Sequence, residues 1–439
     1  MDTLKAKLEK RALPLVVSTV FIDVLGVGIL FPVLPQLIFK IFEPAGFSYK
    51  GSLIMLGWLT AIYPLMQFLA TPILGQLSDR YGRKPVLGFS LAGTAIGYVL
   101  FAIAILTKNI PLLFIARGFD GITGGNISVA RAVIADTTPR ERRAQNFALI
   151  GAAFGFGFVF GPYIGARLAV PGINFFGLFR TPHWFNYAVP FWFTAILSTI
   201  NTILVLMILP ETNKRINHAL KITWTKSIEN IRKAAASPAL RVILTSEFMF
   251  WGGFTFFTTF FQILLIKKLG FKVNNIGDFF AYIGICIAIT QALITPFLAK
   301  RVKGYQIVEI GILGLGIALF LQLLPHNTTQ LLLVAPFIAL FNGLVLANIS
   351  ALISLSADAH IQGEVLGIEA SVQALAQAVP AIISGYVATL GVNMPVIVGG
   401  SVVLFGWLIF VLFYKPTPHV LHDSAANLAT ESVTAMTND

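Results

Sequence analysis

The stretch GQLSDRYGRKPVL at residues 75–87 joins two long apolar runs, residues 52–77 and 86–106. Each run has the roughly 20 mostly apolar residues that a helix needs to cross the hydrocarbon core of a membrane. The connection contains two glycines, which permit a tight turn and close helix approach, and charged side chains that can pair with charges on nearby helix ends. Its net positive charge is typical of a short loop on the cytoplasmic side.

The same alternation of apolar runs and short polar connections fills the chain. Hydrophobic residues make up 56% of the 439 positions and charged residues only 11%, whereas ordinary soluble domains hold roughly 25% charged residues. We therefore predict an all-α integral membrane protein. Its twelve predicted transmembrane helices lie near residues 13–40, 52–77, 86–106, 111–133, 146–169, 188–210, 240–265, 275–298, 305–324, 330–353, 364–388 and 393–414.

Basic residues and one polar segment predict the orientation and the division of the chain. Lysines and arginines gather in alternate connections and in the first residues, which places both termini in the cytoplasm. The polar segment between the sixth and seventh helices is expected to link two six-helix bundles. The predicted parts are an N-terminal tail (1–12), a first bundle (13–210), a cytoplasmic linker (211–238), a second bundle (239–414) and a C-terminal tail (415–439).

A weak internal repeat relates the two halves. The tetrapeptide TPIL at residues 71–74 recurs as TPFL at 295–298, and the same shift places Asp23 on Glu247. Two halves related by an axis along the membrane normal enclose a central cavity between them. Asp23 and Glu247 are then predicted to face each other, although a match of four residues also arises by chance.

Several other classes of function are excluded. The net charge is +12, but the lysines and arginines lie in short clusters between apolar runs rather than together on one polar face. We therefore expect no nucleic-acid partner. The single cysteine, Cys286, permits neither an intramolecular disulfide nor a cysteine-based metal site. No G-x-x-x-x-G-K-(S/T) loop for ATP occurs. We expect no cofactor, no enzymatic activity and a monomer in the lipid bilayer. Energy for transport must come from a gradient or from a partner.

The connection at residues 75–87 resembles the signature loop of the major facilitator superfamily, G-x-L-(A/S)-D-R-x-G-R-(K/R)-x-x-L, and matches it at every specified position. In that family the loop joins helix ends in the outward-open state. The resemblance implies a twelve-helix fold of two bundles and a conformational latch made by Gly75, Asp79, Arg80, Gly82, Arg83, Lys84 and Asp136. The repeated segment at residues 299–304 departs from the pattern, with Lys303 in place of the aspartate, so the second latch is expected to be weak.

Three further segments resemble the tetracycline-exporter-like branch of drug:proton antiporters. Residues 151–166, GAAFGFGFVFGPYIGA, are similar to the antiporters' glycine-proline motif, with Gly157, Gly161, Pro162 and Gly165 at its positions, although small residues four apart also serve ordinary helix packing. Residues 21–35 and 136–143 resemble the same branch. The resemblance implies proton-coupled efflux of a small apolar or amphipathic molecule across the inner membrane by alternating access. Proton-coupled uptake of a nutrient or siderophore-like solute is the alternative.

Ionisable residues within the predicted spans require a reason, because each costs about 2.5–3.5 kcal/mol at the bilayer centre. Asp23 lies near the middle of its span, where we predict that it binds protons or substrate. The alternative is that it only forms a structural hydrogen bond. Arg117 and Asp120 share a face of span four and can neutralise each other. In the family, a span-four arginine near this position is tied to proton coupling. Together with Glu247, these residues form the predicted proton-coupling set.

Glu247 is surrounded in sequence by phenylalanine and tryptophan, from Phe248 to Phe261. Aromatic rings suit flat apolar or cationic molecules, but we expect most of these rings to face lipid. Glu309 and Glu369 lie near predicted cytoplasmic helix ends, where they can snorkel or cap. The residues predicted to line a substrate cavity are Gln373, Gln377, Asn342, Trp251 and Phe254.

Overall fold

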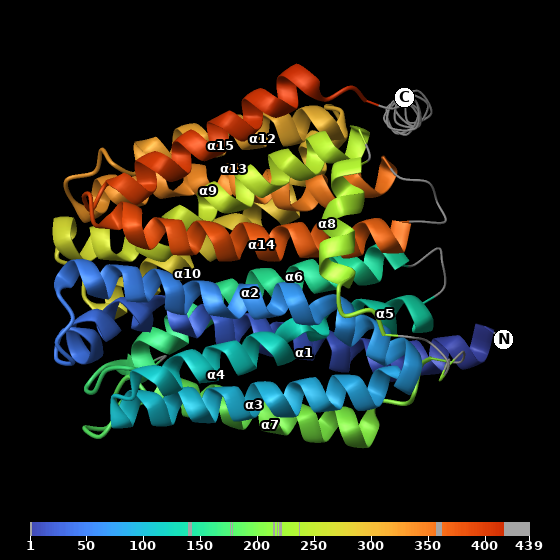
Figure 1. The fold of residues 1–439 in the computed structure, drawn as a ribbon, viewed down its shortest axis with the longest axis horizontal. Helices are drawn as coiled ribbons and strands as arrows, with labels where there is room; N and C mark the ends of the chain where they lie inside the picture. The colour runs from blue at the N-terminus through green and yellow to red at the C-terminus, as the bar shows by residue number, and fades with distance from the viewer. Residues whose placement is uncertain are drawn as a thin grey trace.

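The computed structural model describes residues 2–138, 143–175, 177, 179–213, 216, 218, 222–236, 238–356 and 362–416. Most of its helices run side by side, and the first helix begins and the last helix ends toward the same end of the assembly (Figure 1). Residues 139–142 of the motif at 136–143, part of the predicted linker and most of the predicted C-terminal tail lie outside the described residues. We call the end at which the first helix begins the terminal end, and the opposite end the distal end.

The elements follow one another in three groups. Those before the linker are α1 (Asp2–Leu37), the π-helical turn η1 (Ile38–Phe42), α2 (Tyr49–Tyr81), α3 (Arg83–Thr107), α4 (Ile110–Thr123), the 3₁₀ turn η2 (Gly124–Asn126), α5 (Ile127–Thr137), α6 (Arg143–Leu168), β1 (Asn174–Phe175), β2 (Phe179–Arg180) and α7 (Val189–Ile208). The linker holds α8 (Lys226–Ala236). The last group is α9 (Pro238–Leu269), α10 (Val273–Ile289), the π-helical turn η4 (Thr290–Ile294), α11 (Thr295–Ala299), α12 (Gly304–Leu321), α13 (Thr328–Leu355), α14 (Gln362–Ala388) and α15 (Met394–Phe413).

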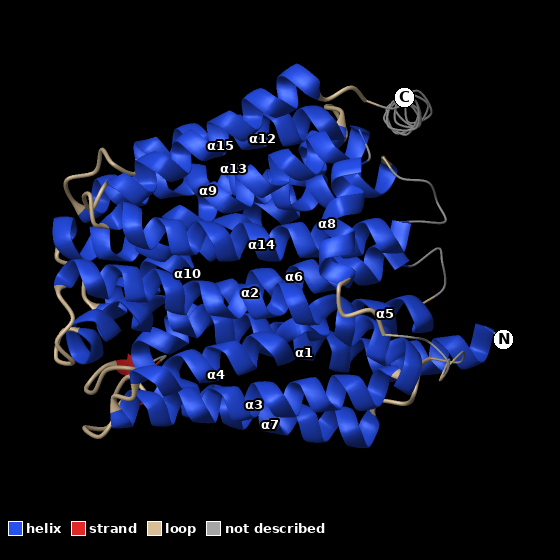
Figure 2. Cartoon of the chain, viewed as in Figure 1, coloured by secondary structure: helices blue, strands red, loops and turns tan. Residues whose placement is uncertain are grey.

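Within the described residues, eleven helices are long and apolar enough to cross a membrane. The predicted fourth span is instead divided among α4, η2 and α5, each too short alone. Strands β1 and β2 pair antiparallel in a loop at the distal end (Figure 2). The chain is thus almost entirely helical, with one interrupted span.

The connection at residues 75–87 is not an extended loop. Helix α2 continues to Tyr81 and α3 begins at Arg83, so Gly82 alone forms the turn. Its φ of +104° is a conformation that other residues rarely adopt. The signature residues therefore lie on the last turn of one helix and the first turn of the next.

The two halves meet along α2 with α14 and along α6 with α10. Glycines allow the backbones to touch there: a Cβ atom at Gly57 would lie 2.9 Å from the Cα of Gly385, and one at Gly277 would lie 2.7 Å from the carbonyl oxygen of Pro162. Helix α8 crosses α2 and α14 at a steep angle near the terminal end (Figure 1).

The rings of α9 do not face lipid, and that expectation was wrong for most of them. Five are almost fully buried: Phe250, Phe256, Phe257, Phe260 and Phe261. The reason is that α9 packs against α13, α14 and α15 of its own half and also against α1 of the other half. A central helix has little surface left for lipid.

Candidate functional site

Asp23 on α1 is a buried carboxylate without a hydrogen-bond partner. It is 8% exposed, and both carboxylate oxygens are buried and unpaired. The side chain of Asn126, on η2, lies within interaction range, and so does Asp120 on α4. An acid held in this way can bind and release a proton without first breaking an ion pair.

Arg117 and Asp120 form the mutual pair that their spacing predicts. A guanidinium nitrogen lies 2.7 Å from an Asp120 carboxylate oxygen, and both side chains are buried. The Arg117 guanidinium also lies over the ring of Tyr63, 4.4 Å from its centroid, in a cation–π arrangement. Asp120 therefore compensates the charge of Arg117, whereas no ion pair is found for Asp23 among the described residues.

The interruption of span four brings α2 close to this cluster. The 3₁₀ turn at Gly124 leaves its carbonyl oxygen outside the regular helix pattern, and the Gln67 amide donates to that oxygen at 3.0 Å. A Cβ atom at Gly125 would lie 2.9 Å from the Cα of Thr71. Asn126 reaches Asp23 because the helix is broken at this point, a relationship that span prediction missed.

The second half has its own acidic cluster, which we call the glutamate pair: Glu247 on α9 and Glu369 on α14. They are 1% and 5% exposed, and they interact electrostatically. Ser350 donates a short hydrogen bond to Glu369. The expectation that Glu369 snorkels or caps was therefore wrong, because the bundle encloses it.

The predicted meeting of Asp23 with Glu247 is not observed. Among the described residues, the groups that act on Glu247 are Glu369, Trp251 and Arg131, whereas those that act on Asp23 are Asn126 and Asp120. The two acids belong to separate clusters, one in each half.

The predicted cavity residues occupy different surroundings. Trp251 and Phe254 are half-buried, with ring centroids 6.4 Å apart. Gln373 and Gln377 are half-buried on α14. Asn342 is 1% exposed and its amide nitrogen has no hydrogen-bond partner, so it lies within helix packing rather than on an open wall.

The latch residues converge on Arg83. Its guanidinium lies 2.7 Å from Asp79 and 3.0 Å from Asp136, and donates to the Ser78 hydroxyl at 2.6 Å. Burial raises the pKa of the Asp136 carboxyl, while Arg83 acts in the opposite direction. Of the remaining signature residues, Arg80 lies 5.1 Å from the ring centroid of Tyr81.

Glu211, at the start of the linker, completes the latch and was missed in the sequence. Its carboxylate accepts hydrogen bonds from the backbone N–H groups of Arg83 at 2.9 Å and Lys84 at 3.1 Å. These are the first groups of α3, which have no partner within the helix. A Cβ atom at Gly82 would lie 2.9 Å from the Glu211 carboxyl carbon, so a glycine there also makes room for Glu211.

The glycine-proline motif of α6 packs directly on α1 beside Asp23. A Cβ atom at Gly157 would lie 2.8 Å from Val24, and one at Gly161 would lie 2.7 Å from the carbonyl oxygen of Leu25. Gly165 stands in the same relation to Ile29, and the ring of Pro162 lies against Gly28. The motif thus fixes the part of α1 that carries the acid.

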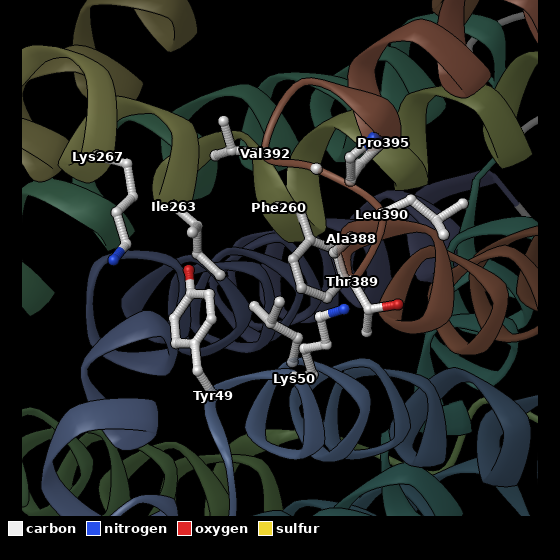
Figure 3. A pocket seen from close by; sticks show the side chains of 12 residues that line it. Tyr49, Lys50, Phe260, Ile263, Lys267, Ala388, Thr389, Leu390, Val392 and Pro395 are labelled. Atoms are coloured by element: carbon white, nitrogen blue, oxygen red, sulfur yellow. The ribbon is translucent and has the colours of Figure 1, made fainter.

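Contacts between the halves also occur at the distal end. Arg167 of α6 and Asp278 of α10 form an ion pair of 2.6 Å, and the rings of Phe31 and Phe280 stack at 5.4 Å. A cavity of about 310 Å³ opens between α2 and the ends of α9 and α14. Figure 3 shows Lys267 above the ring of Tyr49 at its edge.

Comparison with known proteins agrees with this geometry. The sequence profile of the Major Facilitator Superfamily matches residues 16–379. The class C tetracycline resistance protein of Escherichia coli is 30% identical over 368 residues, 84% of this chain and 87% of that protein. The class E protein of Escherichia coli is 29% identical over 363 residues, 82% and 83% of the two chains. The solved structure of a human organic anion transporter has a TM-score of 0.70 at 22% identity, covering 91% of this chain and 99% of that chain.

The all-α membrane fold of two six-helix bundles is therefore confirmed. The protein is a multi-pass membrane transporter of small molecules and not an enzyme. The chain belongs to the major facilitator superfamily, and within it to the tetracycline-exporter-like transporters.

Proposed function

We propose that this transporter expels small apolar or amphipathic organic molecules of the tetracycline type across the inner membrane in exchange for protons. The observation that carries the proposal is Asp23, a buried acid whose two oxygens lack hydrogen-bond partners. The tetracycline resistance proteins that align over most of the chain support the substrate class. An ionised Asp23 carboxylate is unfavourable in an apolar site, and binding of a proton removes its charge.

Contacts between the halves at both ends of the molecule support alternating access as the transport cycle. The rocking units in this proposal are the predicted bundles, residues 13–210 and 239–414. Helix α8 is hydrogen-bonded to both halves at the terminal end, and the Arg167–Asp278 pair joins the halves at the distal end. Protonation of Asp23 removes a charge and changes the relative free energies of the two facing states. We assign both termini to the cytoplasm, and we propose that a monomer carries out the cycle.

The other predicted site residues take supporting roles. Arg117 and Asp120 set the field around Asp23, and Gly157, Gly161 and Gly165 fix α1 against α6. Substrate rests against the half-buried side chains of Trp251, Phe254, Gln373 and Gln377. Glu247 belongs to the proton-coupling set with Asp23.

Everted membrane vesicles test the proposal directly. With an imposed proton gradient, tetracycline should accumulate inside vesicles that contain the wild-type protein, and the Asp23→Asn variant should lose this coupling by at least about tenfold because it cannot change charge. The double variant Asp23→Asn with Asn126→Asp is a useful second test, since it places an acid beside the position from which the Asp23 carboxyl has been removed. Solute leaving the vesicles under the same gradient would support uptake by symport instead. Unchanged coupling in Asp23→Asn would remove Asp23 from the mechanism.

A further inference from the structure

The cavity at the distal end, which we call the lysine cavity, has no role in the proposed transport cycle. Its walls come from both halves of the molecule. Tyr49, Lys50 and Leu53 line it from α2, and the other lining residues lie on α9 and from the end of α14 to the start of α15. A molecule bound in this cavity therefore contacts both halves at once.

Two lysines line the cavity, one from each half. The Lys267 amine of α9 lies 4.6 Å from the ring centroid of Tyr49 on α2, and Lys50 follows Tyr49 along the chain. Both lysines are exposed, and among the residues that the structure describes no ion pair involves either amine. Figure 3 shows the two amines at different sides of the cavity. Helix α2 begins at Tyr49, so its positive end adds to a site that favours an anion.

The rest of the lining is mostly apolar. Phe260 and Ile263 are buried and form part of the wall, and Leu390 is 77% exposed at the cavity. A soluble inorganic anion gains nothing from such side chains, whereas an anion attached to a hydrocarbon chain does. The lining therefore favours an anionic amphiphile.

An exposed aromatic pair continues from the cavity toward the middle of the membrane. Trp58 lies about two turns beyond Lys50 on α2, and Tyr386 lies in the last turn of α14. The Trp58 indole nitrogen donates to the Tyr386 hydroxyl at 3.4 Å, and both side chains are exposed. Trp and Tyr with this exposure are typical of the zone where lipid headgroups meet the hydrocarbon core. Cations at the helix ends and aromatic rings deeper along the same helices match the layout of a phospholipid.

We propose that the lysine cavity binds the phosphate headgroup of an anionic phospholipid from the leaflet at the distal end. Lys50 and Lys267 bind the phosphate, and the acyl chains run along Trp58 and Tyr386. A cavity of about 310 Å³ accommodates a headgroup, while the chains stay in the bilayer. Because the two lysines belong to different halves, the bound lipid bridges the halves and stabilises the arrangement described here.

Lipid binding to the purified, delipidated protein in a neutral detergent tests the proposal. Phosphatidylglycerol should raise the melting temperature, because a ligand that binds only the folded protein stabilises it. Phosphatidylcholine, inorganic phosphate and glycerol 3-phosphate should not. Lys50→Gln and Lys267→Gln should each weaken phosphatidylglycerol binding about fivefold, since one basic residue near an anionic lipid contributes about 1 kcal/mol.

Matched variants separate this site from general attraction to charge. Lys108→Gln removes an exposed lysine at the distal end of α3 and should bind as the wild type does, as should the double variant Lys50→Arg with Lys267→Arg. Equal stabilisation by phosphatidylcholine, or unchanged binding in both glutamine variants, would overturn the proposal. Loss of binding in only one of them would refute bridging of the halves. The same shift with inorganic phosphate would show a site for soluble anions instead of lipid.

Native mass spectrometry of the wild-type protein gives a readout that needs no variant. One phosphatidylglycerol should stay bound under conditions that remove phosphatidylcholine, and equal retention of the two lipids would contradict the proposal. Neither measurement involves transport, so the outcome is independent of the proposed function.

Discussion

The guanidinium of Arg83 and the carboxylate of Asp136 join the start of α3 to the end of α5 through a contact of 3.0 Å. The same guanidinium binds Asp79 and Ser78. One side chain therefore ties together three helix ends, those of α2, α3 and α5. Because all three helices belong to the first half, the junction can move as one unit with that half when the terminal end opens.

We expect Arg83→Gln to weaken the terminal end. The substitution removes the charged partner of two acids, and breaking a partly buried ion pair leaves a carboxylate that is poorly compensated. Transport of tetracycline should fall about tenfold, and impermeant labelling of cysteines placed along the α5 end should increase. Arg301→Gln, in the departing repeat of the loop, is the control and should transport normally. Equal loss in both variants would contradict a specific latch.

The distal pair offers a test by exchange of charges. Asp278→Asn should favour opening of the distal end, because Arg167 loses its partner across the halves. The pair is partly exposed, so the effect should be modest, roughly 1 kcal/mol or less in the balance between states. Spin labels on the distal loops measure the distance between halves. The double variant Arg167→Asp with Asp278→Arg should restore the wild-type distances; failure to restore them would argue against a role for the ion pair.

The α6 glycines provide a matched pair of substitutions. Gly161→Ala places a methyl group 2.7 Å from the Leu25 carbonyl oxygen, whereas Gly155→Ala meets no atom within 4 Å. Overpacking of this kind costs about 1–3 kcal/mol. The melting temperature in detergent should fall for Gly161→Ala and stay constant or rise for Gly155→Ala. If the two variants melt alike, α1 and α6 are not in the close contact described above.

Helix α8 should exchange its amide protons slowly because it is bonded to both halves. Ser227 donates to the carbonyl oxygen of Phe68 at 2.7 Å in the first half, and the Asn230 amide donates to the Ser371 hydroxyl at 3.2 Å in the second. Ser227→Ala with Asn230→Ala should accelerate hydrogen exchange across residues 226–236. Thr225→Ala removes a hydroxyl that bonds Glu229 within the linker and should leave exchange unchanged. No difference between the two would show that α8 is held by other contacts.

The sequence predicted the features that depend on neighbours along the chain. Long apolar runs predicted the membrane fold, and the spacing of Arg117 and Asp120 predicted their ion pair because residues three apart share a helical face. The resemblance to the superfamily placed Arg83 and Asp136 in one latch, where the structure finds them in contact.

Features that depend on packing between distant helices were not predictable in this way. The enclosure of Glu369, its hydrogen bond from Ser350 and the cap that Glu211 makes on α3 each depend on contacts between different helices. The phenylalanines of α9 were wrongly assigned to lipid, because lipid and the helix core are both apolar and the sequence does not distinguish them. The interruption of span four at η2 was not predicted, because glycines such as Gly124 and Gly125 are also common within continuous membrane helices.

The glycines between the halves have a mechanical consequence. Where α2 meets α14 and α6 meets α10, backbone lies against backbone, with Gly57 on Gly385 and Gly277 on Pro162. Where backbones touch in this way, the halves can rotate against each other without first separating interlocked side chains. A single bulky residue at such a point would have to be displaced during this rotation, and it would raise the energy barrier between the two facing states.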